Sequence, residues 1–380
     1  MINIFHNENL IAKFYKDSRK HILEYNSFDL NDSISISLPN TQKFYIYEQD
    51  FIPYFETFLP EGYLFEILKN YLIKEFGYID DYLLFGFLSK NIEGRIRYSE
   101  NTKNESTDLE LNRILEEDTE DTFNYLLKLF FDKNALSGVQ PKTMAILKDK
   151  ENLKFKKYIV KTWGNEFPNL AENEYFCLKA FEFANIPTVK YFLSKNKRFL
   201  IIERFDNENT GFEEIISIMD KNTRKKYSGS YEQVAKAIYK FVSEPREMKI
   251  FFKMIVMNYL LRNGDAHLKN FGLIYNDDFS NISLAPAYDI VNTVAYIRQD
   301  KPALTLIGRK IWHGKKELVS FGIRHCYLKD KEADFLYEEC IEALKKIIKV
   351  LEEYLAENQD FEAGKKMLEI WKISLEENHK

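Results

Sequence analysis

The chain has 380 residues, of which 45% are hydrophobic, 30% charged and 15% aromatic. A chain of this length and composition can bury most of its apolar surface in two or three domains, which excludes disorder, collagen-like structure and disulfide-rich secreted scaffolds. Its 54 basic and 59 acidic side chains give a net charge of −5, which argues against direct nucleic-acid binding because phosphate-backbone binders usually carry a basic surplus.

Residues 1–105 form the first expected unit, a small mixed domain. Alternating residues at 33–38 and 43–47 predict strands, and apolar residues at helical spacing predict a helix over 63–76. Residues 59–62, between the strands and the helix, have the composition of a turn.

The next segment is strongly acidic. Residues 101–121 hold eight acidic and two basic side chains and no aromatic residue. Such charge runs are usually solvated, so we expect a linker or loop at 106–124 rather than a functional acidic tail.

From residue 125 the chain alternates between short apolar runs and amphipathic segments. Strands are predicted at 143–147, 156–163, 189–193 and 198–203, and a helix that opens with acidic residues is predicted at 172–184.

After residue 212 the sequence becomes mostly helical. A nearly continuous apolar helix is expected at 250–261, a short β segment between 271 and 307, and a charged helical tail from 331 onward.

Cysteine usage and hydropathy bear on location. Cys177, Cys326 and Cys340 form no C-x-x-C pair, so we expect buried, reduced thiols rather than a zinc site or a disulfide framework. No stretch approaches 18 uncharged apolar residues, and residues 1–13 lack a basic start followed by an apolar run. We therefore expect no signal peptide, no membrane span and a cytoplasmic location.

The strongest candidate for chemistry is the segment Asn263-Gly264-Asp265-Ala266-His267-Leu268-Lys269-Asn270. It lies between the expected buried helix and a strand, where each buried polar group must find a partner. A turn with a few surface charges is the plainer interpretation, but the apolar segments on both sides argue against it.

A second polar group follows at Pro286-Ala287-Tyr288-Asp289. Alone, Asp289 is typical of a helix N-cap. Together with Asp265 and Asn270 it completes the set that phosphoryl transfer needs. One Asp orients a hydroxyl and accepts its proton, while the Asn and the second Asp hold Mg²⁺.

Lys161 lies inside the apolar strand predicted at 156–163. Such a lysine either extends to solvent from an edge or pairs with a buried group, and Glu174 in the predicted helix could orient it. A strand lysine paired with a helix glutamate is the kinase arrangement for reaching ATP phosphates.

Two further segments carry weaker signals. The loop at 137–142 lacks the Walker spacing and is compatible with a plain turn, although its backbone N–H groups could face phosphate. The strand at 198–203 ends in polar residues, and in a kinase this point would be the hinge between the lobes, where backbone groups bind adenine.

In this order, the segments resemble the HipA family, the bacterial serine/threonine kinase toxins of toxin–antitoxin systems. The resemblance rests on residues 137–142, Lys161, Asn173-Glu174-Tyr175, 203–206, 263–270 and 286–289, and it extends to 35–39 and 58–62 near the N-terminus. It therefore covers essentially the whole chain.

The resemblance implies an α+β, two-lobed protein-kinase-like fold with a mostly helical C-terminal lobe and a small mixed N-terminal subdomain. It divides the chain into a HipA-type N-terminal subdomain at 1–105, the acidic linker or loop at 106–124, an ATP-binding N-lobe-like region at 125–245 and a catalytic C-terminal lobe at 246–380.

The resemblance also implies a role for each motif. Asp265 would be the catalytic residue, Asn270 and Asp289 would hold Mg²⁺, and Glu174 would orient Lys161. The implied ATP-binding residues are Ser137, Gly138, Val139, Gln140, Pro141, Lys142, Lys161, Glu203, Arg204, Phe205, His267, Lys269, Asn270, Tyr288 and Asp289.

Regulation and partners follow from the same resemblance. Family members autophosphorylate a serine in or just before the 137–142 loop, which ejects the loop and switches off ATP binding. Here Ala135 stands where a serine is common, so Ser137 is the remaining candidate. The implied partners are ATP with Mg²⁺, a helix-turn-helix HipB-like antitoxin dimer through which DNA is bound only indirectly, and a protein substrate such as an aminoacyl-tRNA synthetase.

Two other functions are considered. A metallophosphoesterase is suggested by the Asp265-x-His267 spacing, but the chain has only six histidines, and His313 and His325 lie in no ligand cluster. The second is a catalytically silent nucleotide-binding scaffold or co-repressor that works with a DNA-binding antitoxin. Phosphoryl transfer from labelled ATP distinguishes these functions.

Overall fold

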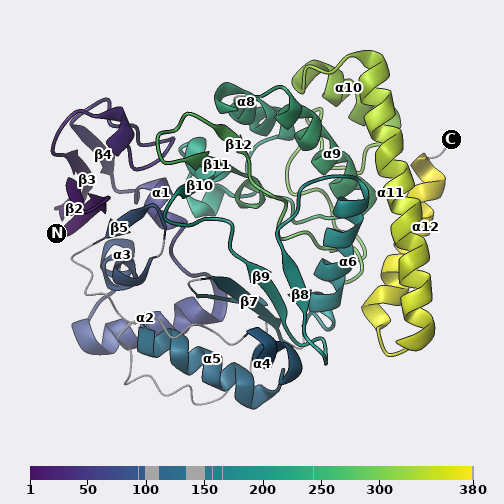
Figure 1. Ribbon diagram of the computed structural model, residues 1–380, viewed down its shortest axis with the longest axis horizontal. Helices are drawn as coiled ribbons and strands as arrows, with labels where there is room; N and C mark the ends of the chain where they lie inside the picture. The colour runs from purple at the N-terminus through teal and green to yellow at the C-terminus, as the bar shows by residue number, and fades with distance from the viewer. Residues whose placement is uncertain are drawn as a thin grey trace.

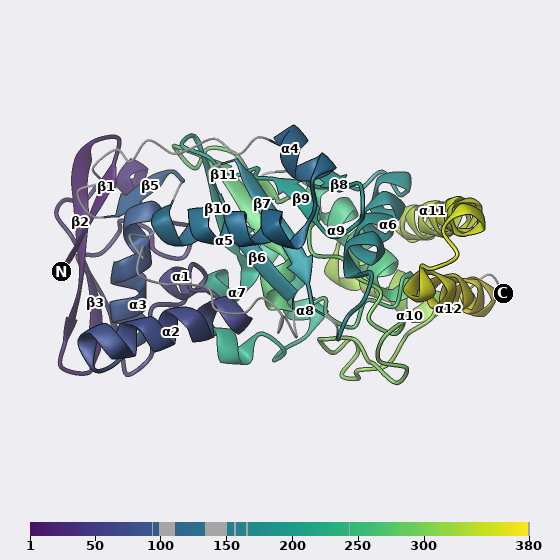
Figure 2. The same ribbon diagram turned by 90° about the horizontal axis from the view of Figure 1, so that it is seen from below.

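The computed structural model describes residues 1–92, 94–98, 111–133, 150–155, 157–164, 166–242 and 244–378. An antiparallel sheet from the N-terminus lies at one end of the molecule and a pair of C-terminal helices lies at the other (Figures 1 and 2). Two smaller sheets and the remaining helices lie between them.

The N-terminal sheet has the strand order β4-β3-β2-β1-β5. Its strands are β1 (Ile2–His6), β2 (Asn9–Asp17), β3 (Lys20–Tyr25), β4 (Phe44–Glu48) and β5 (Ile96–Tyr98). Between β4 and β5 the chain forms the helices α1 (Pro53–Glu56), α2 (Gly62–Phe76) and α3 (Asp81–Leu88). Short 3-10 turns lie at Leu30–Asp32 and Ser89–Asn91. The fully buried rings of Phe14, Phe55 and Phe85 contact one another in its core. The strand predicted at 43–47 and the helix predicted at 63–76 are confirmed as β4 and α2.

The strand predicted at 33–38 is wrong. This segment is irregular, although most of it is buried, because side chains rather than a neighbouring strand satisfy its backbone. The N–H of Ile34 donates to the Tyr25 hydroxyl at 2.9 Å, and the N–H of Ser37 donates to the Glu213 carboxylate at 3.1 Å. Glu213 is only 1% exposed, and it also accepts from the hydroxyls of Ser37 and Ser217. Alternation alone cannot reveal these partners, which lie far away in the sequence.

The second sheet has the order β6-β7-β9-β8. Its strands are β6 (Lys150–Lys154), β7 (Tyr158–Trp163), β8 (Tyr191–Leu193) and β9 (Leu200–Glu203), and α6 (Leu170–Phe183) follows β7. Alternate residues of β9 point to opposite faces. Ile201 therefore packs with α2, α3 and α5, while Leu200 and Ile202 join the larger core that contains α6.

Most of the predictions for this region are confirmed. The strands expected at 156–163, 189–193 and 198–203 are β7, β8 and β9, and the helix expected at 172–184 is α6. The strand expected at 143–147 lies outside the described residues.

The acidic segment differs from the open linker or loop expected at 106–124. Its described part forms α4 (Leu111–Glu116) and the start of α5 (Glu120–Lys133). Asp118 between them is buried, and its Oδ2 accepts from the Ser194 hydroxyl at 2.6 Å and the Asn196 N–H at 2.9 Å. One carboxylate of the charge run therefore fixes the turn between β8 and β9, while Glu116, Glu117, Glu120 and Asp121 are exposed.

A third sheet, β10-β11-β12, joins strands that lie far apart in the sequence. Its strands are β10 (Thr210–Glu214), β11 (Gly272–Asn276) and β12 (Ile282–Leu284). The described helices after β10 are α7 (Ile215–Ile218), α8 (Tyr231–Phe241), α9 (Arg246–Leu260), α10 (Lys315–His325), α11 (Asp330–Glu357) and α12 (Glu362–Asn378). Short 3-10 turns lie at Thr223–Lys225 and Leu268–Asn270. The buried helix expected at 250–261, the β segment between 271 and 307 and the helical tail are confirmed.

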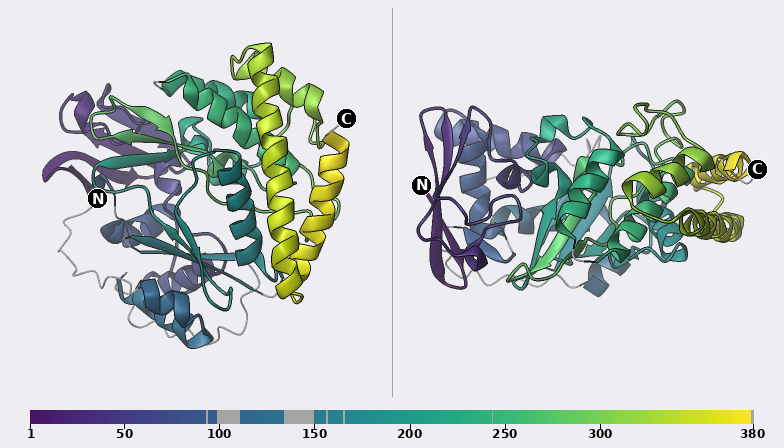
Figure 3. Two further views of the ribbon diagram at one scale, coloured as in Figure 1. Left: turned by 45° about the vertical axis from the view of Figure 1, so that its right-hand side comes forward. Right: turned by 90° about the horizontal axis from the view of Figure 1, so that it is seen from above.

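Helices α11 and α12 run side by side along one edge of the molecule, where α11 packs on α6 and α9 (Figure 3). The cysteines Cys177, Cys326 and Cys340 are free and buried, as expected. Of the helices in the described ranges, none combines the length and the apolar character that crossing a bilayer requires.

Candidate active site

Lys161 lies in the middle of β7 and is almost completely buried, with 5% of its surface exposed. Its Nζ donates to Glu174 Oε1 at 2.5 Å and to Asp289 Oδ1 at 3.0 Å. Glu174 is fully buried on α6. An unpaired charge in this position would be costly, so the ammonium group is fixed by two carboxylates, one on α6 and one in the segment that follows β12.

The residue next to Glu174 on α6 holds the segment that carries Asp289. The Asn173 amide donates to the Asn292 carbonyl at 3.0 Å and accepts from the Asn292 N–H at 2.8 Å. Asp289 itself has a φ of +60°, a left-handed conformation that Asp tolerates better than most residues. One helix thus positions both the lysine and the aspartate that meets it.

Asp265 follows the buried helix α9, which anchors it through a short relay of amides. The Asn263 side chain donates to Asn258 on α9 at 2.7 Å, and its oxygen accepts from the Asp265 N–H at 3.0 Å. Gly264 lies so close to Asp300 and Thr293 that a Cβ atom would clash with both side chains. The polar segment at 263–270 is therefore fixed to the buried helix α9. This agrees with its predicted position between a buried helix and a strand.

Asn270 links the segment that carries Asp265 to the segment that carries Asp289. Its amide nitrogen donates to the backbone carbonyl of Asp265 at 2.8 Å and to that of Asp289 at 3.4 Å. The nitrogen is thereby committed to the backbone, so the amide oxygen is the atom that can accept a further ligand.

His267 is buried beside these groups. Its Nε2 lies 3.9 Å from Asp265 Oδ1, and burial lowers the pKa of the imidazole below its ordinary value although the Asp265 charge opposes this effect. A neutral imidazole is thus favoured at pH 7, and it can still donate one hydrogen bond.

Two residues that the sequence did not assign to the site lie at its centre. The Tyr227 hydroxyl donates to Asp265 Oδ1 at 2.8 Å. Glu61, from the N-terminal subdomain, accepts from Lys269 at 2.5 Å and from Lys226 at 2.8 Å. Glu61 belongs to the segment at 58–62, which the sequence marks as a turn and as part of the family resemblance but not as part of the site, and no sequence signal marks Tyr227.

Neighbouring carboxylates keep Lys269 protonated. Burial alone would lower the pKa of Lys269, but the carboxylates of Glu214 and Glu61 outweigh burial and raise it. Lys269 is therefore cationic at neutral pH and suited to an anionic ligand.

The expected hinge follows β9. The N–H groups of Glu203 and Arg204 donate to the carbonyls of Lys190 and Lys157, at 2.8 and 2.9 Å, so neither is available to a ligand in this arrangement. The Phe205 ring contacts Tyr288, with 6.1 Å between the ring centroids. The Tyr288 hydroxyl donates to the Lys269 carbonyl at 2.8 Å, which links the hinge to the Asp265 segment.

The structure thus brings together Lys161, Glu174, Asp265, His267, Lys269, Asn270, Tyr288 and Asp289. Glu203, Arg204 and Phe205 lie at the end of β9, which pairs with the Lys161 strand β7. The other predicted residues are in the loop Ser137, Gly138, Val139, Gln140, Pro141 and Lys142, which lies outside the described residues.

The donor set fits a magnesium ion and a phosphate group. Asn270 and Asp289 offer oxygen atoms, which Mg²⁺ prefers, and Lys161 and Lys269 offer cations. Two buried atoms, Glu174 Oε2 and His267 Nδ1, have no hydrogen-bond partner within the described part of the chain. The described residues contain no group of three or more His, Cys, Asp or Glu that could hold a metal.

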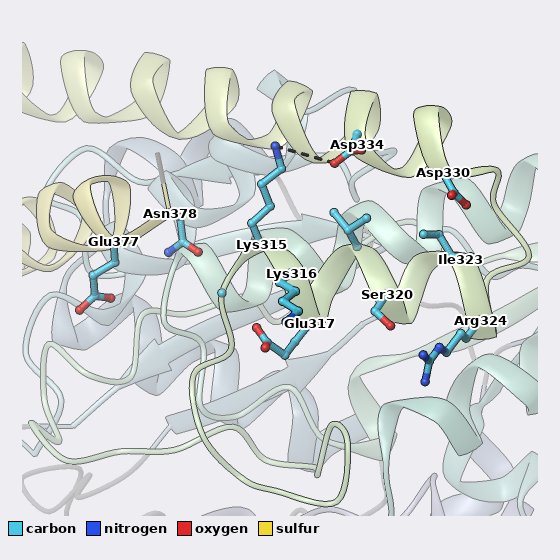
Figure 4. A pocket seen from close by; sticks show the side chains of 12 residues that line it. Lys315, Lys316, Glu317, Ser320, Ile323, Arg324, Asp330, Asp334, Glu377 and Asn378 are labelled. Atoms are coloured by element: carbon cyan, nitrogen blue, oxygen red, sulfur yellow. Dashed lines mark ion pairs between the residues drawn. The ribbon is translucent and has the colours of Figure 1, made fainter. Parts of the chain in front are cut away.

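A separate pocket of about 710 Å³ lies between α10, the start of α11 and the end of α12 (Figure 4). It is lined by both basic and acidic side chains, and Lys315 and Asp334 form an ion pair of 3.8 Å across it. None of the predicted site residues lines this pocket.

A strand lysine paired with a buried helix glutamate, in a two-lobed fold with a mostly helical C-terminal lobe, places the chain in the protein-kinase-like fold class. Residues 134–348, more than half of the chain, match the family model described as the HipA-like C-terminal domain. The chain belongs to this family.

Two relatives named as kinases also match the chain. A Haemophilus influenzae protein named "Putative kinase" is 33% identical over 186 residues, which are 43% of this chain and 53% of that protein. The Sinorhizobium fredii "Putative kinase Y4dM" is 24% identical over 289 residues, which are 69% of this chain and 67% of that protein. The chain thus spans about half to two thirds of the length of these relatives.

The fold itself is shared with a chain from the Shewanella oneidensis MR-1 complex of HipA, HipB and operator DNA. The TM-score is 0.70 at 13% identity, and the likeness covers 98% of this chain and 96% of that chain. The predicted fold class is confirmed.

Proposed function

We propose that this chain is an ATP- and Mg²⁺-dependent serine/threonine protein kinase that acts as a bacterial toxin. The observation that carries the proposal is the position of Lys161, whose Nζ is held by Glu174 at 2.5 Å and by Asp289 at 3.0 Å. Kinases use such a lysine to reach the nucleotide phosphates. Membership of the HipA-like family and the names of the curated relatives support the same function.

In the proposed reaction Asp265 orients the acceptor hydroxyl and takes its proton. Asn270 and Asp289 would hold Mg²⁺, which neutralises charge on the phosphates when it is bound. Lys161, His267 and Lys269 would bind phosphate oxygens. Phe205 and Tyr288 offer an aromatic surface for adenine. The N–H donors of Glu203 and Arg204 are already paired, so their expected part in adenine recognition would need other atoms of these residues.

We further propose a helix-turn-helix antitoxin as a partner, because the chain shares its fold with a chain from a complex of HipA, HipB and operator DNA. DNA would then be bound only through the antitoxin, in keeping with the net charge of −5. The proposed substrate is a component of translation such as an aminoacyl-tRNA synthetase. The proposed location is the cytoplasm. The experiment that tests the function is transfer from labelled ATP to proteins of a bacterial lysate, which a catalytically silent scaffold would not perform.

The Asp289 carboxylate offers a test of the metal site. Asp289→Asn keeps the size and the tolerance of a positive φ but removes the charge. We expect Mg²⁺-dependent ATP binding to weaken about 10-fold or more. Calorimetric titrations with and without Mg²⁺ measure the effect. Equal weakening in the absence of Mg²⁺ would show that Asp289 acts only through Lys161.

Ser137 offers a test of autoregulation. A phosphate on this serine adds about −1.5 to −2 charge, which would repel the triphosphate if the loop covers it, as the family resemblance implies. We expect active protein to carry phosphate on Ser137 and Asp265→Asn protein to lack it. Intact-mass spectrometry with peptide mapping decides this. An unmodified Ser137 in active protein would mean that this chain has no such switch.

A further inference from the structure

The proposed catalytic aspartate already has a hydroxyl partner. The Tyr227 hydroxyl donates to Asp265 Oδ1 at 2.8 Å, although the residue is 46% exposed. An acceptor serine or threonine would have to make this same bond, from an O–H donor to the Asp265 carboxylate, before its proton could be removed.

Tyr227 is held in this position by several contacts. Its ring meets the His267 ring edge-on, with 5.1 Å between the centroids. Its carbonyl accepts from Lys310 at 3.1 Å, and the carbonyl of the preceding Lys226 accepts from the Leu268 N–H at 3.1 Å. The Tyr227 loop is therefore tied to the Asp265 segment through both its backbone and its ring.

The N-terminal subdomain holds the same loop at two points. Glu56, at the end of α1, accepts from the Thr223 N–H at 2.8 Å. Glu61 accepts from Lys226 at 2.8 Å and from Lys269 at 2.5 Å. Helix α1 packs against α7, which precedes this loop, as Figure 2 shows.

The Glu61 contact persists at physiological pH. Burial would raise the pKa of this carboxyl, but Lys269 and Lys226 outweigh burial and hold the pKa at about 2. The carboxylate is therefore ionised, and its hold on the two lysines does not depend on pH near neutrality.

We propose that Tyr227 occupies the acceptor-hydroxyl position on Asp265, and that Glu61 of the N-terminal subdomain controls how readily Tyr227 leaves it. This inference rests on the proposed function. An acceptor protein must displace the tyrosine before transfer, so the N-terminal subdomain slows phosphoryl transfer in the absence of any partner but does not abolish it. A substrate or partner that draws Glu61 away from Lys226 would release the site.

Two conservative variants test the two parts of this proposal. Tyr227→Phe keeps the ring but removes the hydroxyl that competes for Asp265. Glu61→Gln keeps the size but removes the charge that holds Lys226. The matched controls are Tyr239→Phe, at a half-exposed tyrosine on α8, and Glu66→Gln, at an exposed glutamate on α2.

The first readout is independent of catalysis. Acetylation of tyrosine hydroxyls by N-acetylimidazole, mapped by mass spectrometry, measures how often Tyr227 leaves Asp265. We expect Glu61→Gln to raise acetylation of Tyr227 several-fold over Glu66→Gln. The second readout is transfer from labelled ATP to a degenerate serine/threonine peptide library. A hydrogen bond to a charged group is strong enough that Tyr227→Phe should raise kcat/KM for the peptides about 10-fold, with ATP affinity unchanged.

The outcomes separate this proposal from the proposed function. An active wild type whose kcat/KM for the peptides is not increased by Tyr227→Phe overturns the role of Tyr227 alone. Equal acetylation in Glu61→Gln and Glu66→Gln overturns the role of Glu61. Absence of transfer by the wild type and by every variant overturns the proposed function, and the restraint falls with it.

Discussion

Asp265→Asn is expected to reduce phosphoryl transfer by about 10²-fold or more while the protein stays folded. The bonds that link this residue to the Asn263 and Asn270 side chains use its backbone, whose N–H donates to Asn263 and whose carbonyl accepts from Asn270. An asparagine retains both bonds but cannot take the proton of an acceptor hydroxyl. Initial rates with labelled ATP measure the loss, and circular dichroism with thermal unfolding checks the fold.

Asp17→Asn is the matched control, because this exposed aspartate lies at the end of β2, within the N-terminal sheet. In cells, expression of the intact chain without an antitoxin should arrest growth, and Asp265→Asn should relieve the arrest. Transfer at the wild-type rate by the asparagine variant would show that Asp265 is not the proton acceptor.

Lys161→Met is expected to destabilise the protein by about 3–5 kcal/mol, because it leaves Glu174 buried without its charged partner. Glu174 is fully buried and Lys161 is 5% exposed, so solvent screens this pair little. Urea unfolding measures the change in the free energy of unfolding. Binding of Mg²⁺-ATP should weaken in the same variant, since the lysine proposed to contact the phosphates is gone.

The double variant Lys161→Met with Glu174→Gln is the control for this prediction. It removes the unpaired charge, so it should recover much of the lost stability but none of the activity. A single Lys161→Met variant as stable as the wild type would mean that the ion pair with Glu174 does not form.

Helix and strand periodicity in the sequence was sufficient to predict the elements that carry the main residues of the candidate site. The apolar run of α9 followed by polar residues located Asp265 and Asn270. The strand that holds Lys161 and the helix that holds Glu174 were predicted from their patterns, and the structure adds the contact between the two side chains. Such features depend on strand and helix periodicity, which the sequence displays directly.

Long-range contacts account for what the sequence did not reveal. Tyr227 meets a residue 38 positions later, and Glu61 meets Lys269 across 208 positions. The acidic residue Asp118 is buried only because the turn after β8 supplies its donors. None of these partners leaves a periodic signal, since each depends on how separate elements pack.

The buried carboxylate of Glu213 has a consequence for how the molecule unfolds and tolerates cutting. Its donors include Ser37, 176 residues earlier in the chain, so removal of the N-terminal subdomain would strip a buried acid of part of its hydrogen bonding. A fragment that begins after residue 105 would therefore be a poor substitute for the whole chain. The N-terminal subdomain and the rest of the chain should therefore unfold in one calorimetric transition. A protease should not release the N-terminal subdomain as a stable fragment.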